Sequence, residues 1–66
     1  NKEMTIVEGF GNDVELDDLS SRLKSQLACG GTVKDGHIEL QGNHLRRIKE
    51  VLVDEGFDES SIEVKR

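Results

Sequence analysis

The sequence contains no proline, tryptophan or tyrosine, one cysteine and only two phenylalanines. With so few aromatic rings, the chain offers no broad platform on which single-stranded bases could stack. The lone Cys29 cannot form an internal disulfide, which is typical of a protein from a reducing compartment. The apolar runs are far shorter than a transmembrane helix, and no segment has the pattern of a secretory signal. We therefore expect a soluble cytoplasmic protein that does not enter a membrane.

The chain of 66 residues is long enough for one domain and too short for a deep catalytic cleft. A domain of this size buries only about 60% of the surface of its unfolded chain, so its stability is marginal. Apolar residues make up 33% of the sequence and recur at regular spacings, which is typical of a folded domain and not of a disordered tail. We expect a single monomeric domain over residues 1–66.

The net charge of −5 argues against indiscriminate nucleic-acid binding, because affinity for phosphates comes largely from lysine and arginine. The positive charges are nevertheless gathered within an acidic frame. Two windows, 19–34 and 43–49, lack acids and hold most of the bases: Arg22, Lys24, Lys34, Arg46, Arg47 and Lys49. These windows are the candidates for a nucleic-acid contact.

The first window contains a predicted helix over residues 16–28. Leu16, Leu19, Leu23 and Leu27 recur at spacings of three and four residues, which places them along one face of a helix. The acids at its start suit the positive end of the helix dipole. A glycine pair after its last turn favours a helix end there. In a domain this small, we expect the leucine face to be core and not a partner-binding surface.

The second window contains the other predicted helix, which follows Asn43, a favourable N-cap residue. Its buried side is predicted to comprise Leu45, Ile48, Val51 and Leu52. Arg46, Arg47 and Glu50 then point away from the core, and Gly56 ends the helix.

Four short segments are predicted to be strands, at residues 3–8, 32–34, 37–41 and 61–65. The second and third flank Asp35-Gly36, a strong signal for a two-residue hairpin turn. The order is therefore β-α-β-β-α-β. Two amphipathic helices on one face of a small sheet satisfy both apolar stripes, so we expect an α+β two-layer sandwich.

Two adjoining segments carry a family resemblance. Residues 29–34 (CGGTVK) and 38–44 (IELQGNH) closely resemble the translation initiation factor 1 family of archaea and eukaryotes, particularly its archaeal members. Residues 5–9 (TIVEG) are similar to the second strand of that family, and residues 56–57 (GF) and 62–64 (IEV) are similar to its closing segment. The resemblance covers nearly the whole chain.

The resemblance implies a mixed sheet with two helices on one side. Family members usually carry a preceding strand and a basic hairpin loop, whereas only Asn1, Lys2 and Glu3 precede the first strand here. We therefore expect that strand, and most of the positive charge of the loop, to be absent from this chain. Asn43 stands at the start of the second predicted helix, where archaeal relatives often have aspartate, and both residues cap helices.

The resemblance also implies a function. We expect a non-enzymatic initiation factor that binds the small ribosomal subunit near the decoding site and promotes accurate start-codon selection. Ribosomal RNA is the expected direct partner, and initiator tRNA and other initiation factors are further expected partners. The residues expected to bind are Arg46, Arg47, Lys49, His44, Arg22, Lys24, Lys34 and Lys2. On pattern alone, Arg46, Arg47 and Lys49 are equally compatible with an ordinary solvated helix face, since Glu50 lies beside them.

Other chemistry is poorly supported by the sequence. Cys29, His37 and His44 match no zinc-site spacing, and no base is marked as a partner for a Cys29 nucleophile. Gly30-Gly31 lacks the lysine and hydroxyl residue of a phosphate-binding P-loop, so a helix end and a tight strand entry explain it better. We expect neither a metal nor a cofactor, and Cys29 is expected to pack at the end of the first helix.

Two alternative functions stay open. The chain could be a translation-associated domain of a related protein, of the density-regulated protein type or a bacterial homologue. It could also be a protein-interaction module whose acidic ends bind a basic partner without contacting RNA.

Overall fold

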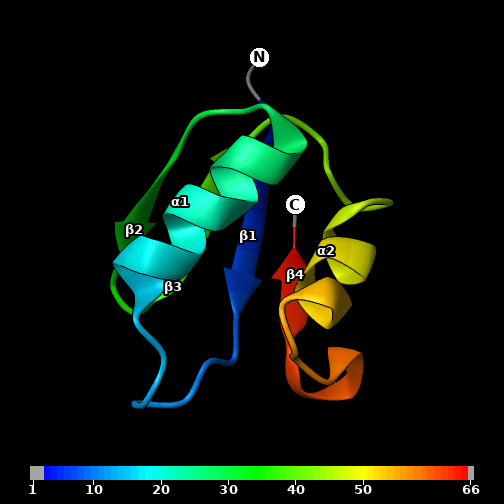
Figure 1. Ribbon diagram of the computed structural model, residues 1–66. Coiled ribbons are helices and arrows are strands. Elements are labelled where there is room, and N and C mark those ends of the chain that lie inside the picture. Colours follow the sequence, from blue (N-terminus) through cyan, green and yellow to red (C-terminus); the bar gives the residue numbers. More distant parts are fainter. Residues whose placement is uncertain (1–2, 66) are drawn as a thin grey trace.

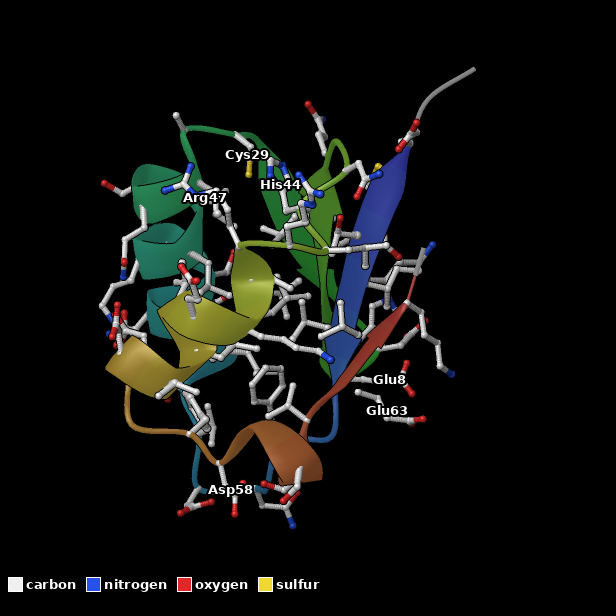
Figure 2. All side chains as sticks on the ribbon, turned by 90° about the vertical axis from the view of Figure 1, so that its right-hand side faces the viewer. Glu8, Cys29, His44, Arg47, Asp58 and Glu63 are labelled. Carbon is white, nitrogen blue, oxygen red and sulfur yellow. The ribbon has the colours of Figure 1, made fainter. Side chains whose placement is uncertain are left out.

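The computed structural model describes residues 3–65 of the chain (Figure 1). In chain order, its elements are β1 (Met4–Glu8), α1 (Leu16–Leu27), β2 (Gly31–Lys34), β3 (His37–Gln41), α2 (Ile48–Asp54), the short 3-10 helix η1 (Glu59–Ser61) and β4 (Glu63–Lys65). α1 lies in front of the sheet in Figure 1, α2 lies to the right beside β4, and the turned view of Figure 2 shows both helices on the same face. The predicted α+β two-layer sandwich and its element order are confirmed.

The strand order is β2-β3-β1-β4, and all described strand pairs are antiparallel. The mixed sheet implied by the resemblance is therefore wrong for the described residues. The antiparallel pairing follows from the two helical crossovers. Each crossover joins two strands that run in the same direction, but these two strands are not neighbours in the sheet. β1 and β2 are joined through α1, with β3 inserted between them; β3 and β4 are joined through α2, with β1 inserted. The inserted strand runs the opposite way in both cases, as in split β-α-β units.

The core is the apolar layer between the helices and the sheet. Its members are less than a tenth exposed: Val7, Leu19, Leu23, Leu27, Ile38, Leu40, Ile48, Val51 and Leu52. The predicted leucine stripe of α1 supplies three of them, while Leu16 and Leu45 are only half-buried. The alternation of β3 places Ile38 and Leu40 inside, as predicted.

α1 ends slightly earlier than the glycine pair suggests. Ala28, not Gly30, takes the left-handed conformation that closes the helix, with φ of 53°. The Cys29 N–H then donates to the Lys24 carbonyl at 3.1 Å. Gly31 instead allows close approach between strands, because a Cβ there would collide with the Glu39 carbonyl oxygen.

α2 begins later than predicted. Asn43 is not its N-cap, since the helix starts after Arg47 and residues 45–47 form a separate turn. The Asn43 side chain accepts a hydrogen bond from the Leu45 N–H at 3.2 Å, so it stabilises this turn and not the helix. The Ile48 N–H donates to the His44 carbonyl at 2.8 Å and joins the turn to α2.

The turn between β2 and β3 and the turn before β4 lie at the end of the sheet where β1 ends, and both have local causes. Asp35 and Gly36 both have positive φ, 51° and 80°, as the predicted two-residue hairpin turn requires. Ser61, the first residue of the predicted last strand, belongs to η1 instead. Asp58 stabilises this turn by accepting hydrogen bonds from both the N–H and the hydroxyl of Ser60, at 3.0 and 2.9 Å. Within residues 3–65, no helix is long and apolar enough to cross a bilayer.

Truncation of either helix stripe should destabilise the domain strongly. Leu23 and Ile48 are both fully buried, so Leu23→Ala and Ile48→Ala should each lower the free energy of unfolding by about 2–4 kcal/mol through cavity formation. Val53→Ala is the matched control, because Val53 is 49% exposed and should change stability by less than about 0.5 kcal/mol. Chemical denaturation would measure all three, and equal effects at all sites would contradict the assigned core.

The Asp58 cap should make η1 sensitive to acid. Hydrogen bonds from the Ser60 backbone N–H and then from its hydroxyl lower the pKa of Asp58 below its ordinary value. A lowered folded pKa stabilises the protein above the unfolded pKa of about 3.9, and this stabilisation is lost as the pH falls through the folded pKa. Asp58→Ala should therefore lower the denaturation midpoint at pH 7, and the gap to the parent should shrink toward pH 2. A gap that stays constant over this range would argue against the cap.

Candidate nucleic-acid interface

Opposite charges lie at opposite ends of the sheet. Figure 2 shows His44 and Arg47 at one end, beside Cys29, and Asp58 at the other. The first end is formed by the loops after α1 and β3; the second is formed by the loops after β1, β2 and α2. The second end carries acids from all three of its loops: Asp13, Glu15, Asp35 and Asp58. We call the first end, with His44, Arg46 and Arg47, the basic end.

A buried hydroxyl anchors the loop that carries the basic end. Thr5 lies in β1 and is 0% exposed. Its Oγ1 donates to the Gly42 carbonyl at 2.8 Å and accepts from the His44 N–H at 2.9 Å. Both bonds join residues that are almost forty positions apart in the chain, so the loop start is held against β1. The loop geometry therefore depends on the core and not only on local turn preferences.

Hydrogen bonds hold both the backbone N–H and the ring of His44. Its Nε2 lies 2.7 Å from the Gln41 carbonyl oxygen, and because a carbonyl only accepts, Nε2 carries the hydrogen. The ring rests over Gly42, where a Cβ would come within 2.9 Å of Nε2. Gly42 also has a φ of 104°, which favours glycine. A contact from the His44 ring to a phosphate would have to use Nδ1.

The three bases of the second window do not share one face. Arg46 and Arg47 lie in the turn before α2, Lys49 lies on α2, and all three are exposed. Arg47 reaches toward the C-terminal turns of α1, as Figure 2 shows, and its Nη2 lies 3.4 Å from the Gln26 carbonyl oxygen. Lys49 follows by two residues and thus lies on the other flank of the helix.

The two bases of α1 lie on opposite flanks of its leucine stripe, as a period of 3.6 residues dictates. Arg22 faces α2, and its Nε forms an ion pair with Glu55 Oε1 at 2.6 Å. Gln26, one turn later, donates to the other carboxylate oxygen of Glu55 at 3.0 Å. Lys24 is on the other flank, near Cys29, where its charge partly offsets the rise in the thiol pKa that burial causes.

The remaining predicted site residues are not brought to the basic end. Lys34 is exposed at the end of β2, beside the hairpin turn, and pairs across the sheet with His37. His37 and Gln41 lie at opposite ends of β3, so Lys34 and His44 are separated by the length of that strand. Lys2 lies outside the described residues. Of the predicted binding residues, only His44, Arg46 and Arg47 therefore form one surface, and the other described ones are separate charges.

Among the side chains that the structure describes, which leave out Glu59, no group of three or more His, Cys, Asp or Glu could hold one metal ion. Cys29 is half-buried and packs against the core, as expected. Burial raises the pKa of its thiol, so it is a poor nucleophile near neutral pH.

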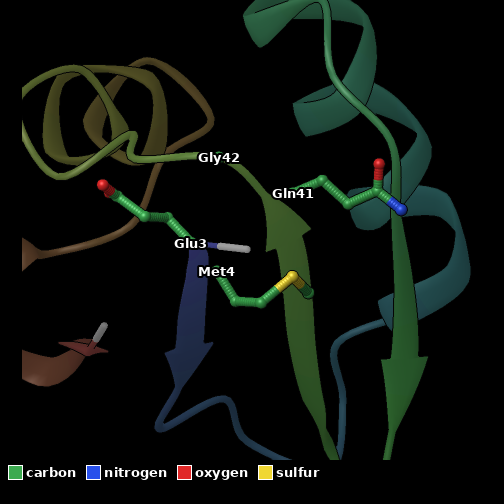
Figure 3. Close-up of a pocket in the computed structure, with 4 residues that line it drawn as sticks. All are labelled: Glu3, Met4, Gln41 and Gly42. Carbon is green, nitrogen blue, oxygen red and sulfur yellow. The ribbon is translucent and has the colours of Figure 1, made fainter. Parts of the chain in front are cut away.

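An open hollow of about 330 Å³ lies beside the basic end, lined by Glu3, Met4, Gln41 and Gly42 (Figure 3). Met4 and Gln41 face each other across β1 and β3. They alternate with the buried Thr5 and Leu40, so they lie on the sheet face that the helices leave uncovered.

Sequence reasoning missed Thr5, Gln26 and Glu55. Thr5 could have been found, because it is in phase with Val7 on the buried side of β1. Gln26 had a weaker signal, its position one turn after Arg22. Glu55 had none, since it meets Arg22 across a separation of 33 residues.

Removal of the Thr5 hydroxyl should loosen the basic end. Thr5→Val keeps the shape but leaves the Gly42 carbonyl and the His44 N–H without their partner, which should cost about 1–3 kcal/mol of unfolding free energy. Thr32→Val is the matched control, because Thr32 is exposed on β2. Amide hydrogen exchange at His44 should accelerate in the first variant only. Unchanged exchange together with unchanged stability would show that the hydroxyl does not anchor the loop.

Comparison with known proteins shows to which family the sequence belongs. The family model described as Translation initiation factor SUI1 matches residues 1–58. Three archaeal proteins, each named protein translation factor SUI1 homolog, align over 62 residues and 92% of this chain. They are 60% identical in Sulfurisphaera tokodaii, 61% in Sulfolobus acidocaldarius and 56% in Methanosarcina barkeri.

The chain spans only part of the length of these relatives, 62%, 63% and 61% respectively. The match nevertheless includes α1, the β2–β3 hairpin, the Thr5-anchored loop and α2. Because the family model covers most of the chain and the identities are high, the chain belongs to the translation initiation factor SUI1 family.

Proposed function

We propose that this chain binds the small ribosomal subunit near the decoding site and there promotes accurate start-codon selection. Family membership supports the translation role. The observation that carries the binding proposal is the basic end, where a loop fixed by the buried Thr5 presents exposed Arg46 and Arg47. Contacts of this kind go to RNA phosphates, which position a protein without reading sequence.

The charge separation supports this orientation. With a net charge of −5, the chain as a whole is repelled by RNA, so attraction requires that the cations lie apart from the acids. The basic end meets this condition, because the acidic loops lie at the opposite end of the sheet. Approach to RNA with the basic end foremost keeps those acids away from the phosphates. Ribosomal RNA is therefore the proposed direct partner, and initiator tRNA and other factors would be contacted from the same bound position.

The proposed role is non-catalytic. The histidines and the cysteine that could do chemistry are committed or shielded: His44 Nε2 bonds a carbonyl, His37 pairs with Glu39 at 2.9 Å, and Cys29 has a raised pKa. A binding protein of this size can act by occupying a position on the subunit and leaving it when a correct codon pairing forms.

Co-sedimentation with purified archaeal small subunits tests the proposal directly. Arg46→Ala should weaken association and reduce the slope of log affinity against log salt by about one, because it removes one phosphate contact. The triple variant Arg46→Ala, Arg47→Ala and Lys49→Ala should bind still more weakly, with an unchanged circular dichroism spectrum because all three are exposed.

Lys34→Ala is the matched control for Arg46→Ala, since it removes one exposed charge at the other end of the sheet. It should leave affinity and salt slope close to those of the parent. A parent chain that does not sediment with the subunit at low salt would refute the proposal. Equal losses in Arg46→Ala and Lys34→Ala would show that general charge, and not the basic end, mediates association.

A further inference from the structure

We infer that the phosphate-binding surface extends over the α1–α2 seam, defined as Arg22, Gln26, Arg47 and Glu55, with Gln26 and Glu55 as positioning residues for the two arginines. The inference rests on the proposed RNA binding and adds to it. An acid within an RNA-binding surface would then strengthen binding, which is the opposite of what its charge alone predicts.

The seam is a continuous chain of polar contacts between the two helices. Arg22 Nε lies 2.6 Å from Glu55 Oε1, and Gln26 Nε2 lies 3.0 Å from Glu55 Oε2, so both carboxylate oxygens are used. Arg47 Nη2 lies 3.4 Å from the Gln26 backbone oxygen and extends the chain toward the basic end. Two residues of α1 thus connect the residues that precede and follow α2.

The exposures indicate which group a phosphate would meet. The side chain of Glu55 is 16% exposed, whereas that of Arg22 is 53% exposed. The carboxylate is therefore the more sheltered member of the pair, and the guanidinium lies on the solvent side. An approaching phosphate would contact N–H groups before it came near the carboxylate. Glu55 is placed to hold Arg22 and not to repel RNA.

The arginines keep donors for a partner. A guanidinium has five N–H donors in a fixed fork. Arg22 uses its Nε toward Glu55, and Arg47 uses Nη2 toward Gln26, so the terminal nitrogens of Arg22 and part of the Arg47 fork can bind phosphate oxygens. Arginine is suited to this because its planar fork loses less freedom for each hydrogen bond formed. Side chains already held in place lose less conformational entropy on binding.

Other bases lack this arrangement. Lys24 lies on the other flank of α1, and Lys49 lies on the flank of α2 away from Arg47. Lys49 also lines a shallow hollow together with Glu50, Val53 and Asp54, where two acids lie beside it. The seam therefore differs from a simple sum of surface charges.

Two variants test the positioning role in the same co-sedimentation assay. Gln26→Ala leaves the net charge unchanged, and it should weaken association about threefold because Glu55 loses one of its two partners. Glu55→Ala removes a negative charge, and it should nevertheless weaken association about three- to fivefold, the range expected for loss of an exposed ion pair. The Arg22 Nε–H resonance in a nitrogen-correlated NMR spectrum should be observable in the parent and exchange-broadened in Glu55→Ala.

Glu50→Ala is the matched control, because it removes the same charge from the exposed surface of α2. It should leave association unchanged or tighten it. Tighter binding by both Glu55→Ala and Glu50→Ala would overturn the inference, since both acids would then act only by repulsion. Parent-like affinity in Gln26→Ala would also overturn it. A loss of affinity in this variant would not be explained by unfolding, because Gln26 is exposed. If the parent itself does not sediment with the subunit, the proposed function fails first.

Discussion

The rest of the structure depends on a single apolar layer shared by two helices and one sheet face. Neither helix can bury its stripe alone, and a chain of 66 residues has material for only one such layer. Leu23 of α1 and Ile48 of α2 are both fully buried in it, above Val7 and Ile38 of the sheet. Because both helices need the same surface, they lie side by side on it. Their seam, where the polar flanks meet, is a consequence of this packing.

Polar groups tie the functional loop to that layer. Thr5 occupies an inward position of β1 that an apolar residue could fill, and its hydroxyl is satisfied by Gly42 and His44. A buried hydroxyl without partners would be costly, so the loop must return to this place for the core to form well. Folding and presentation of Arg46 and Arg47 are therefore coupled. The proposed RNA binding would benefit from such coupling, because the cations would be fixed before the protein meets its partner.

The same fold determines where the charged loops lie. The crossover connections send the loops after α1 and β3 to one end and the loops after β1, β2 and α2 to the other. The acidic and basic segments of the sequence alternate along the chain, yet this topology places most of the loop acids at one end and His44, Arg46 and Arg47 at the other, with Lys34 and Glu50 as exceptions. The negative net charge and a cationic binding surface are thus compatible. In addition, an acid directly after α2, Glu55, forms an ion pair with a base on α1, Arg22.

The sequence by itself determined the helices, the Asp35-Gly36 hairpin and most of the core, because hydrophobic periodicity and turn chemistry act over a few residues. It also identified the family, through residues 29–34 and 38–44. It did not determine the start of α2, which is displaced by the anchored loop, or the antiparallel sheet, which follows from the two interlocked crossovers. Only the tertiary structure decided which bases lie close together. Arg22 and Arg47 were linked through Glu55 and Gln26, while Lys34 was placed at the other end of the sheet, because contacts such as Arg22–Glu55 join residues that no local pattern relates.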